Sequence, residues 1–277
     1  MTGAMTGTRR GRRRPTAWDV VAYRTVNACL VGFLLLPILV VLLFSINPAP
    51  FIQFPPHGVS LRWFVKFFNS RDFMASFRLS VELALLTVVG ATVIGTMAAL
   101  ALVRGRLPGA GFLAALFLSP LMLPAMLTGL ALFQLYVLLD VGRPFWGLLI
   151  GHIVIAIPYV IRTTVAVLHN FDRSLEEAAR NLGASELVTF REVTLPLIRP
   201  GVIAGAIFAF VVSFDQFPLS LFLVNPGQET LPITMFNYLR YDFDPTIAAA
   251  STVSIALSLA VVLLLERTVG LQDYVKL

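Results

Sequence analysis

SLEEAARNLGASELVTFREVTLP, residues 174–196, is a polar stretch between two long apolar segments. It carries too many charged side chains to cross a bilayer. Ser174 followed by Glu177 fits a capping box, which predicts a helix that begins at Ser174. Small and apolar residues recur with helical spacing at Leu175, Ala178, Ala179 and Leu182. On this periodicity alone, an ordinary amphipathic loop is the simpler interpretation.

A glycine divides the stretch into two parts. Gly183 is the residue type that commonly follows the last turn of a helix. A second short helical pattern runs from Ser185 towards Val193, and we expect Leu195-Pro196 to end it. The stretch therefore predicts two short helices with a sharp turn at Gly183, lying on a membrane surface.

The composition places the rest of the chain in a membrane. Of 277 residues, 57% are hydrophobic and 13% are charged, and the mean hydropathy is +0.84. Soluble domains carry about 25% charged residues. The single cysteine, Cys29, excludes an internal disulfide and a cysteine metal site. The three histidines are scattered, so we expect no metal site and no cofactor, and we interpret His152 as a packed residue.

The apolar pattern predicts an all-α membrane protein with six membrane-spanning helices. The expected spans are residues 26–46, 80–103, 110–139, 145–167, 201–224 and 246–265. Pro120 and Pro124 lie in the third span, which we therefore expect to be kinked or re-entrant.

The connecting segments complete the expected organisation. Residues 61–77 mix aromatic side chains with cations, which predicts a helix at the membrane interface. Residues 225–245 are expected to form a polar loop. The chain then divides into a basic N-terminal tail, a six-helix domain that contains the polar loop, and a C-terminal tail, with bounds 1–25, 26–267 (loop 172–200) and 268–277.

The distribution of lysine and arginine predicts the orientation. If the N-terminus is cytoplasmic, fourteen of these cations lie on that side and six lie outside, namely Arg62, Lys66, Arg71, Arg78, Arg143 and Arg240. The positive-inside rule then places both termini and the 172–200 loop in the cytoplasm. The N-terminal RRGRRR run is interpreted as a topology signal beside lipid headgroups, so we expect no nucleic-acid partner.

Three polar residues in the fifth expected span are candidates for a solute pathway: Ser213, Asp215 and Gln216. A carboxylate inside an apolar span costs about 2.5–3.5 kcal/mol on insertion scales, so such groups are usually functional. The alternative is a polar cluster that bonds neighbouring helices. The chain contains no G-x-x-x-x-G-K-[ST] loop, so any ATP hydrolysis that drives transport is expected on another polypeptide.

The spacing within the polar loop resembles the EAA signature of ABC-importer membrane subunits. Glu177, Ala178 and Ala179 are followed by Gly183 and, nine residues later, by a segment that ends in Leu195 and Pro196. The resemblance implies the type I ABC-importer permease fold, and it implies that the loop is the coupling helix that docks on a separate ATPase. We expect Glu177, Ala178, Ala179, Gly183, Leu195 and Pro196 to carry this coupling.

The segment from Ser213 to the sixth span is similar to the second membrane subunit of spermidine/putrescine-type permeases, which carries a Ser-x-Asp pattern matched by Ser213 and Asp215. That family implies an inner-membrane importer with a related second permease, two copies of an ATPase and an extracytoplasmic solute-binding protein. Polyamine-transporting members tend to have further acids along the path, where this chain has Gln216 and, approximately, Leu121.

Several alternatives remain open from the sequence. The substrate implied by the resemblance is a polyamine, but another amine, an aminophosphonate or an opine-like solute is the runner-up. An ATP-independent secondary transporter or channel would need coupling-ion acids or an inverted repeat, and the sequence shows one deep carboxylate and no clear repeat. An enzyme would need a paired acid–base or metal constellation within the spans, which the sequence lacks, so we expect a non-catalytic permease subunit.

Overall fold

The structure is a computed structural model that describes residues 17–269 except 52, 54, 56, 57, 106, 143, 226 and 243. In these residues the regular elements are helices, and the one pairing of extended backbone is an isolated bridge between Asn225 and Gln228. The RRGRRR run and the end of the expected C-terminal tail, 270–277, lie outside the described residues. The all-α prediction is confirmed.

Five helices are long and apolar enough to cross a membrane. They are α1 (Ala17–Ser45), α3 (Arg71–Arg104), α6 (Phe145–Asn170), α9 (Leu195–Phe214) and α12 (Thr246–Val269). A sixth span results if the bent pair α4 (Ala110–Leu118) and α5 (Ala125–Leu138) is counted as one. The expected number of spans is thus confirmed, although α1 begins at Ala17, inside the expected N-terminal tail.

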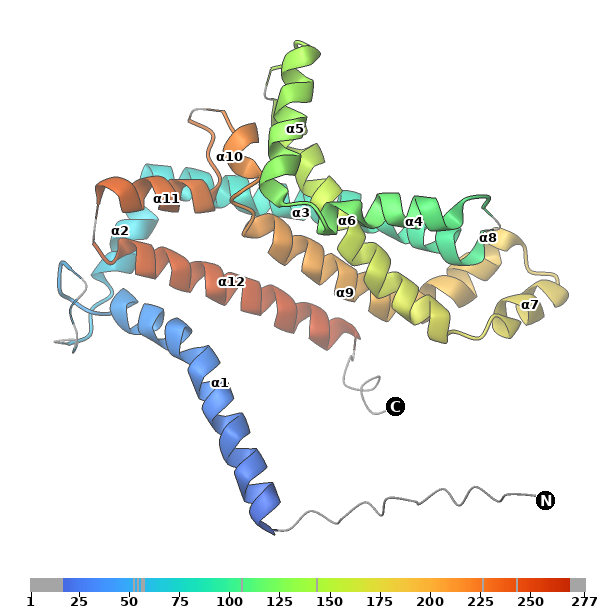
Figure 1. Ribbon diagram of the computed structural model, residues 1–277, viewed down its shortest axis with the longest axis horizontal. Helices are drawn as coiled ribbons and strands as arrows, with labels where there is room; N and C mark the ends of the chain where they lie inside the picture. Colours follow the sequence, from blue (N-terminus) through green and yellow to red (C-terminus); the bar gives the residue numbers. More distant parts are fainter. Residues whose placement is uncertain are drawn as a thin grey trace, which may run out of the picture.

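The third span is broken where its prolines lie. After α4, a 3₁₀ turn at Ser119–Leu121 contains Pro120, and Pro124 immediately precedes α5. Proline lacks the N–H that would continue an α-helix, and it disfavours helical backbone in the residue before it. The two halves are bent by 101°, and α5 rises steeply from the bundle in Figure 1. The predicted kink is confirmed.

Helices α3, α6 and α9 form the centre of the bundle (Figure 1). Gly201 and Gly205 of α9 form a G-x-x-x-G face on which α6 approaches closely. A Cβ on Gly205 would lie 2.7 Å from the Cα of Val160. Since backbone atoms cannot move aside as a flexible side chain can, this contact requires glycine.

Two connecting segments differ from the sequence expectation. The interfacial helix expected at 61–77 is instead a short helix, α2 (Arg62–Asn69), followed after Ser70 by the start of α3. Ser70 separates them because its hydroxyl oxygen accepts a hydrogen bond from Phe73 N, at 3.4 Å, and so caps α3. The loop expected at 225–245 contains another helix, α11 (Leu231–Tyr241).

The fifth span also ends earlier in the sequence than expected. The apolar pattern predicted residues 201–224, whereas α9 ends at Phe214 and is followed by one short helical turn, α10 (Ser220–Leu223). The break lies just before Pro218, which has no N–H to donate and disfavours helical backbone at Phe217. Apolar periodicity does not register this break because Phe217 and Leu219 keep the segment hydrophobic.

The bundle has two differently built ends (Figure 1). The short helices α2 and α11 lie at one end, and the helices of the 172–200 loop, α7 (Ser174–Asn181) and α8 (Glu186–Thr189), lie at the other. The two groups of candidate residues, in the loop and near the end of α9, are therefore separated along the long axis.

Candidate functional site

The loop between α6 and α9 forms two helices with a glycine elbow, as the sequence predicted. Gly183 has φ +90°, in the left-handed region that residues with a side chain rarely adopt. Gly183 N donates to Arg180 O at 2.9 Å, and Ala184 N donates to Ala179 O at 3.1 Å. These bonds satisfy carbonyls at the end of α7 and fix the direction in which the chain leaves it.

The predicted capping box at the start of α7 is wrong. The helix begins at Ser174, but its side chain makes no capping bond with Glu177. Instead Ser174 N donates to Asp172 Oδ1 at 2.9 Å. Hydrogen bonds from Ser174 hold the pKa of the Asp172 carboxyl below its ordinary value. An aspartate two residues earlier thus takes the role expected of the serine.

The second half of the loop also differs from the expectation. Ser185 caps α8 by accepting a bond from Val188 N at 3.4 Å. The helix then does not end before Leu195-Pro196 but continues through a π-helical turn, Phe190–Thr194, directly into α9. Pro196 falls in the first turn of α9, where its missing N–H is tolerated, so it does not break the helix. The second half of the loop and the fifth span are therefore one continuous helix from Glu186 to Phe214.

The apolar side chains of the loop face outwards. Leu175, Leu182, Leu187 and Val188 are 48%, 89%, 75% and 48% exposed, and we call these four residues the coupling surface. Of the residues expected to carry coupling, Glu177, Ala178, Gly183, Leu195 and Pro196 are also exposed, and Ala179 is half-buried. Exposed apolar side chains that gather on one surface are typical of a contact with another molecule.

One functional candidate was missed by the sequence reasoning. Glu176, next to Glu177, is buried and accepts a hydrogen bond from Thr194 Oγ1 at 2.8 Å. Its other carboxylate oxygen lies 3.5 Å from Arg104 Nε at the end of α3. Buried glutamates are almost always paired. The only sequence signal is an arginine, Arg104, at the end of the second apolar segment, and its position does not identify its partner.

Ser213 belongs to a buried polar cluster between helices. His152 of α6 bridges two hydroxyls: its Nδ1 lies 2.8 Å from Ser213 Oγ and its Nε2 lies 2.9 Å from Ser220 Oγ. Ser213 Oγ also donates to Thr87 Oγ1 of α3, at 3.2 Å. His152 is thus a packed, hydrogen-bonded residue, as interpreted from the sequence, and it holds the two ends of the 213–220 break together.

Asp215 and Gln216 lie elsewhere than expected. Asp215 does not lie inside a long helix; it follows the last residue of α9, and its N–H donates to Val211 O at 3.2 Å. Its exposed side chain lines an open pocket of about 390 Å³ together with Phe214, Phe217 and residues of α11 and α12. Gln216 is half-buried. The three pathway candidates therefore do not share one surface. Ser213 faces the interior of the helix bundle, and Asp215 faces outwards.

A second, larger cleft opens at the α2/α11 end. It has a volume of about 860 Å³ and lies between α3 and α11. Its charged lining residues are Asp72, Arg78, Glu82, Glu229 and Asp242. Glu229 is engaged within the chain, because Asn237 Nδ2 donates to both of its carboxylate oxygens at 3.1 and 3.0 Å.

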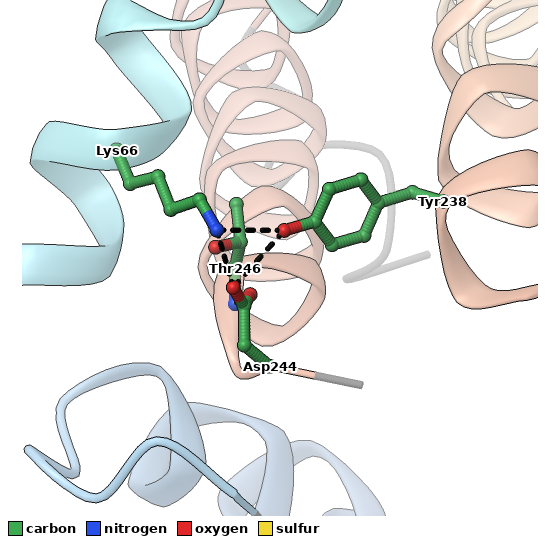
Figure 2. Close-up of polar contacts among 4 residues, drawn as sticks. All are labelled: Lys66, Tyr238, Asp244 and Thr246. Carbon is green, nitrogen blue, oxygen red and sulfur yellow. Dashed lines mark hydrogen bonds and ion pairs between the residues drawn. The ribbon is translucent and has the colours of Figure 1, made fainter. Parts of the chain in front are cut away.

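Beside this cleft, an ionic contact joins three elements (Figure 2). Lys66 of α2 donates to Asp244 Oδ2 and, at 3.0 Å, to Tyr238 Oη of α11. Tyr238 Oη donates to the same carboxylate at 3.0 Å, and Thr246 N at the start of α12 donates to Asp244 Oδ1 at 2.9 Å. We call Lys66, Tyr238 and Asp244 the α2 latch. In residues 17–269, apart from those left undescribed, no group of three or more His, Cys, Asp or Glu side chains is placed to hold a metal ion.

Comparison with known proteins gives concordant matches. The family described as binding-protein-dependent transport system inner membrane component matches residues 1–270. The chain is 31% identical to the spermidine/putrescine transport system permease protein PotC of Escherichia coli over 233 residues, which is 84% of this chain and 88% of that protein. It is 34% identical to the putrescine transport system permease protein PotI of Escherichia coli over 227 residues, 79% of this chain and 80% of that protein.

A solved structure shares the fold. The crystal structure of a bacterial ABC transporter involved in the import of the acidic polysaccharide alginate aligns with a TM-score of 0.65 and 18% identity. The alignment covers 92% of this chain and 97% of that chain. The predicted ABC-importer permease fold is confirmed.

Proposed function

The chain belongs to the binding-protein-dependent transport system inner membrane component family, and from this membership we propose that it forms half of the translocation pathway of an ATP-driven polyamine importer. As a member it is a multi-pass permease component of the inner membrane, not an enzyme. In the proposed complex it pairs with a related second permease, two copies of an ATPase and an extracytoplasmic solute-binding protein, with both of its termini in the cytoplasm.

The observation that carries the coupling proposal is the exposed apolar face of the loop. Burying an exposed leucine is worth about 1.5–3 kcal/mol, so the coupling surface is an unfilled contact in the isolated chain. The second half of the loop, which carries Leu187 and Val188, is joined to α9 through the continuous helix Glu186–Phe214. A partner that displaces the coupling surface would therefore also move α9. Asp215 directly follows the last residue of α9.

Support for a polyamine comes from the names of the relatives, both of which are polyamine permeases. Asp215 supplies one exposed carboxylate near the end of α9, which suits an ammonium group. Gln216 stands where such permeases tend to have a further acid, so an amine of lower charge or an aminophosphonate is the second candidate.

The test is reconstitution with the partner subunits. We expect ATP hydrolysis by the assembled complex to rise when the solute-binding protein is loaded with spermidine or putrescine, and not when it is offered 2-aminoethylphosphonate or amino acids. Stimulation by a zwitterionic solute alone would contradict the polyamine assignment. Failure of any ATPase to co-purify would contradict the coupling assignment.

A matched pair of variants locates the ATPase contact. Leu182→Asp puts a charge on the most exposed residue of the coupling surface, and we expect it to lower ATPase co-purification about tenfold, because a buried charge without a partner opposes docking. Tyr241→Asp, at a 78% exposed position on α11 at the other end of the bundle, is expected to leave co-purification unchanged. Equal effects of the two variants would contradict the placement of the docking surface.

A further inference from the structure

The acidic residue that leads into the EAA signature has a different environment from its neighbour. Glu176 is 7% exposed, whereas the side chain of Glu177 is 60% exposed and pairs with Arg173 at 3.6 Å, one turn earlier in the same segment. Exposed pairs of this kind contribute little. Glu176 points towards the membrane helices, and Glu177 points towards solvent. The two consecutive carboxylates of α7 therefore lie on different faces of the helix.

Glu176 brings three separate segments together. Its Oε1 accepts from Thr194 Oγ1, at 2.8 Å, in the π-helical turn that leads into α9. Its Oε2 lies 3.5 Å from Arg104 Nε, and Arg104 ends α3, seventy-two residues earlier in the sequence. The guanidinium of Arg104 also lies over the ring of Phe171, which precedes the loop, at 5.0 Å from the ring centroid. One carboxylate thus contacts both the start of α9 and the end of α3.

These contacts join the loop to α3, which does not directly adjoin the loop in the sequence. The loop is covalently continuous with α6 and α9, but α3 is reached only by non-bonded contacts. Because a buried charge without its partner is costly, Glu176 and Arg104 strongly favour the arrangement in which they meet. The π-helical turn at Phe190–Thr194 lies inside this junction, and single π-turns within α-helices are frequent where a helix has a functional role.

We propose that Glu176 is a positioning residue that carries movement of the coupling loop to α3, by holding α7, the start of α9 and the end of α3 as one body. The inference rests on the proposed function and assigns a separate role within it: Glu177 and the coupling surface contact the ATPase, and Glu176 passes the resulting displacement into the bundle. When the loop moves, α3 moves with α9 instead of staying behind.

The first test compares two isosteric changes in the reconstituted complex. Glu176→Gln keeps an oxygen that accepts from Thr194 but removes the charge opposite Arg104. We expect this variant to co-purify with the ATPase. The stimulation of its ATP hydrolysis by spermidine-loaded binding protein should be about tenfold smaller than in wild type, a size typical of coupling between two sites. Glu177→Gln is expected to weaken co-purification while the complexes that do assemble keep their stimulation. Normal stimulation in the Glu176→Gln complex overturns the inference.

A second variant separates transmission from folding. Glu176→Gln combined with Arg104→Gln leaves no unpaired buried charge, so this chain is expected to insert and assemble normally. We expect it to remain as poorly stimulated as Glu176→Gln alone, since the ionic contact between the loop and the end of α3 is still missing. Recovery of stimulation in the double variant would mean that the single change acted through an unpaired charge, and would overturn the inference.

The third measurement needs no transported solute. In a Cys29→Ser background, spin labels at Ser174→Cys on α7 and Met97→Cys on α3 occupy exposed positions on the two elements. The distance between the labels is expected to stay constant when ATP binds the wild-type complex, and to change in the Glu176→Gln complex. A change of equal size in both complexes overturns the inference. If the wild-type chain recruits no ATPase, it is the proposed function that has failed.

Discussion

At the scale of single residues, the loop shows where helical periodicity was informative and where it was not. The stripe of Leu175, Ala178, Ala179 and Leu182 was identified by its spacing, yet this stripe is mostly exposed. The buried side chain of the helix is Glu176. Periodicity identifies an apolar face but assumes that its partner belongs to the same chain. In this protein the carboxylate of Glu176 pairs with Arg104 of the same chain, whereas the leucines of the stripe are exposed.

Gly183 offers the sharpest single-residue prediction. A Cβ at Gly183 would meet no heavy atom within 4 Å, so Gly183→Ala has no steric conflict and costs only backbone strain at φ +90°, about 1–2 kcal/mol. We expect this strain to shift the direction of α8 and to lower ATPase co-purification several-fold. Gly183→Asn should recover most of it, because asparagine tolerates the left-handed region better.

Gly32→Ala is the control for Gly183→Ala, since a Cβ at Gly32 also meets nothing within 4 Å and Gly32 lies in α1 without a positive φ. Equal behaviour of Gly183→Ala and Gly183→Asn would show that the elbow does not depend on its left-handed conformation.

At the scale of elements, the sequence predicted which segments are helices better than it predicted where they end. The broken third span followed from Pro120 and Pro124. The end of α9 did not follow, although Pro218 marks it, because hydrophobicity continues across the break. The continuity of α8 with α9 was missed for the opposite reason: Pro196 was treated as a stop, but it lies at the start of a helix, where proline is tolerated.

The α2 latch, which joins α2, α11 and the start of α12, makes stability depend on pH. Burial alone would raise the pKa of Asp244, but hydrogen bonds from Lys66, Thr246 and Tyr238 outweigh it and hold the pKa below its ordinary value of 3.8. Hydrogen bonding to Asp244 raises the pKa of Lys66 above its ordinary value of 10.5. The contribution of Asp244 to the free energy of unfolding is therefore present at pH values above its ordinary pKa. It is lost as the pH falls through the lowered pKa of the folded protein. The contribution of Lys66 is present at pH values below 10.5, and it is lost as the pH rises through the raised pKa of the folded protein.

We therefore expect Asp244→Asn to lower the free energy of unfolding at pH 7 by about 1 kcal/mol or less, since half of the Lys66 side chain is exposed. This difference from wild type should be constant near neutral pH and shrink below pH 3.8 and above pH 10.5. The measurement is the fluorescence of Trp63, which is buried in α2 and donates to Asn47 O, in a chain in which Trp18 and Trp146 are replaced by Phe. This fluorescence reports the separation of α2 from the rest of the bundle. Asp242→Asn, at an exposed carboxylate two residues away, is the control. An equal, pH-independent loss in both variants would contradict the latch.

At the scale of the whole molecule, the sequence predicted the all-α class, the number of membrane spans and the family signature. It did not predict which candidate residues contact one another. Ser213 and Asp215 are two residues apart, so even a continuous helix would have placed them about 200° apart, on nearly opposite faces. Ser213, in the last turn of α9, contacts His152, whereas Asp215, just beyond the end of α9, lines a pocket with residues of α11 and α12. Contacts of this kind depend on residues 61 to 126 positions apart, for which a single sequence carries no signal.

The orientation of the molecule is a prediction from charge alone, and it can be tested on the described residues. In a Cys29→Ser background, single cysteines at Asn181 on α7, Val141 in the turn before α6 and Tyr241 on α11 are all exposed. If the fourteen cations mark the cytoplasmic side, an impermeant thiol reagent labels Val141→Cys and Tyr241→Cys in right-side-out vesicles and Asn181→Cys only in inside-out vesicles. The reverse pattern would put the coupling surface outside, beyond the reach of a cytoplasmic ATPase. It would thus contradict both the orientation and the coupling role that depends on it.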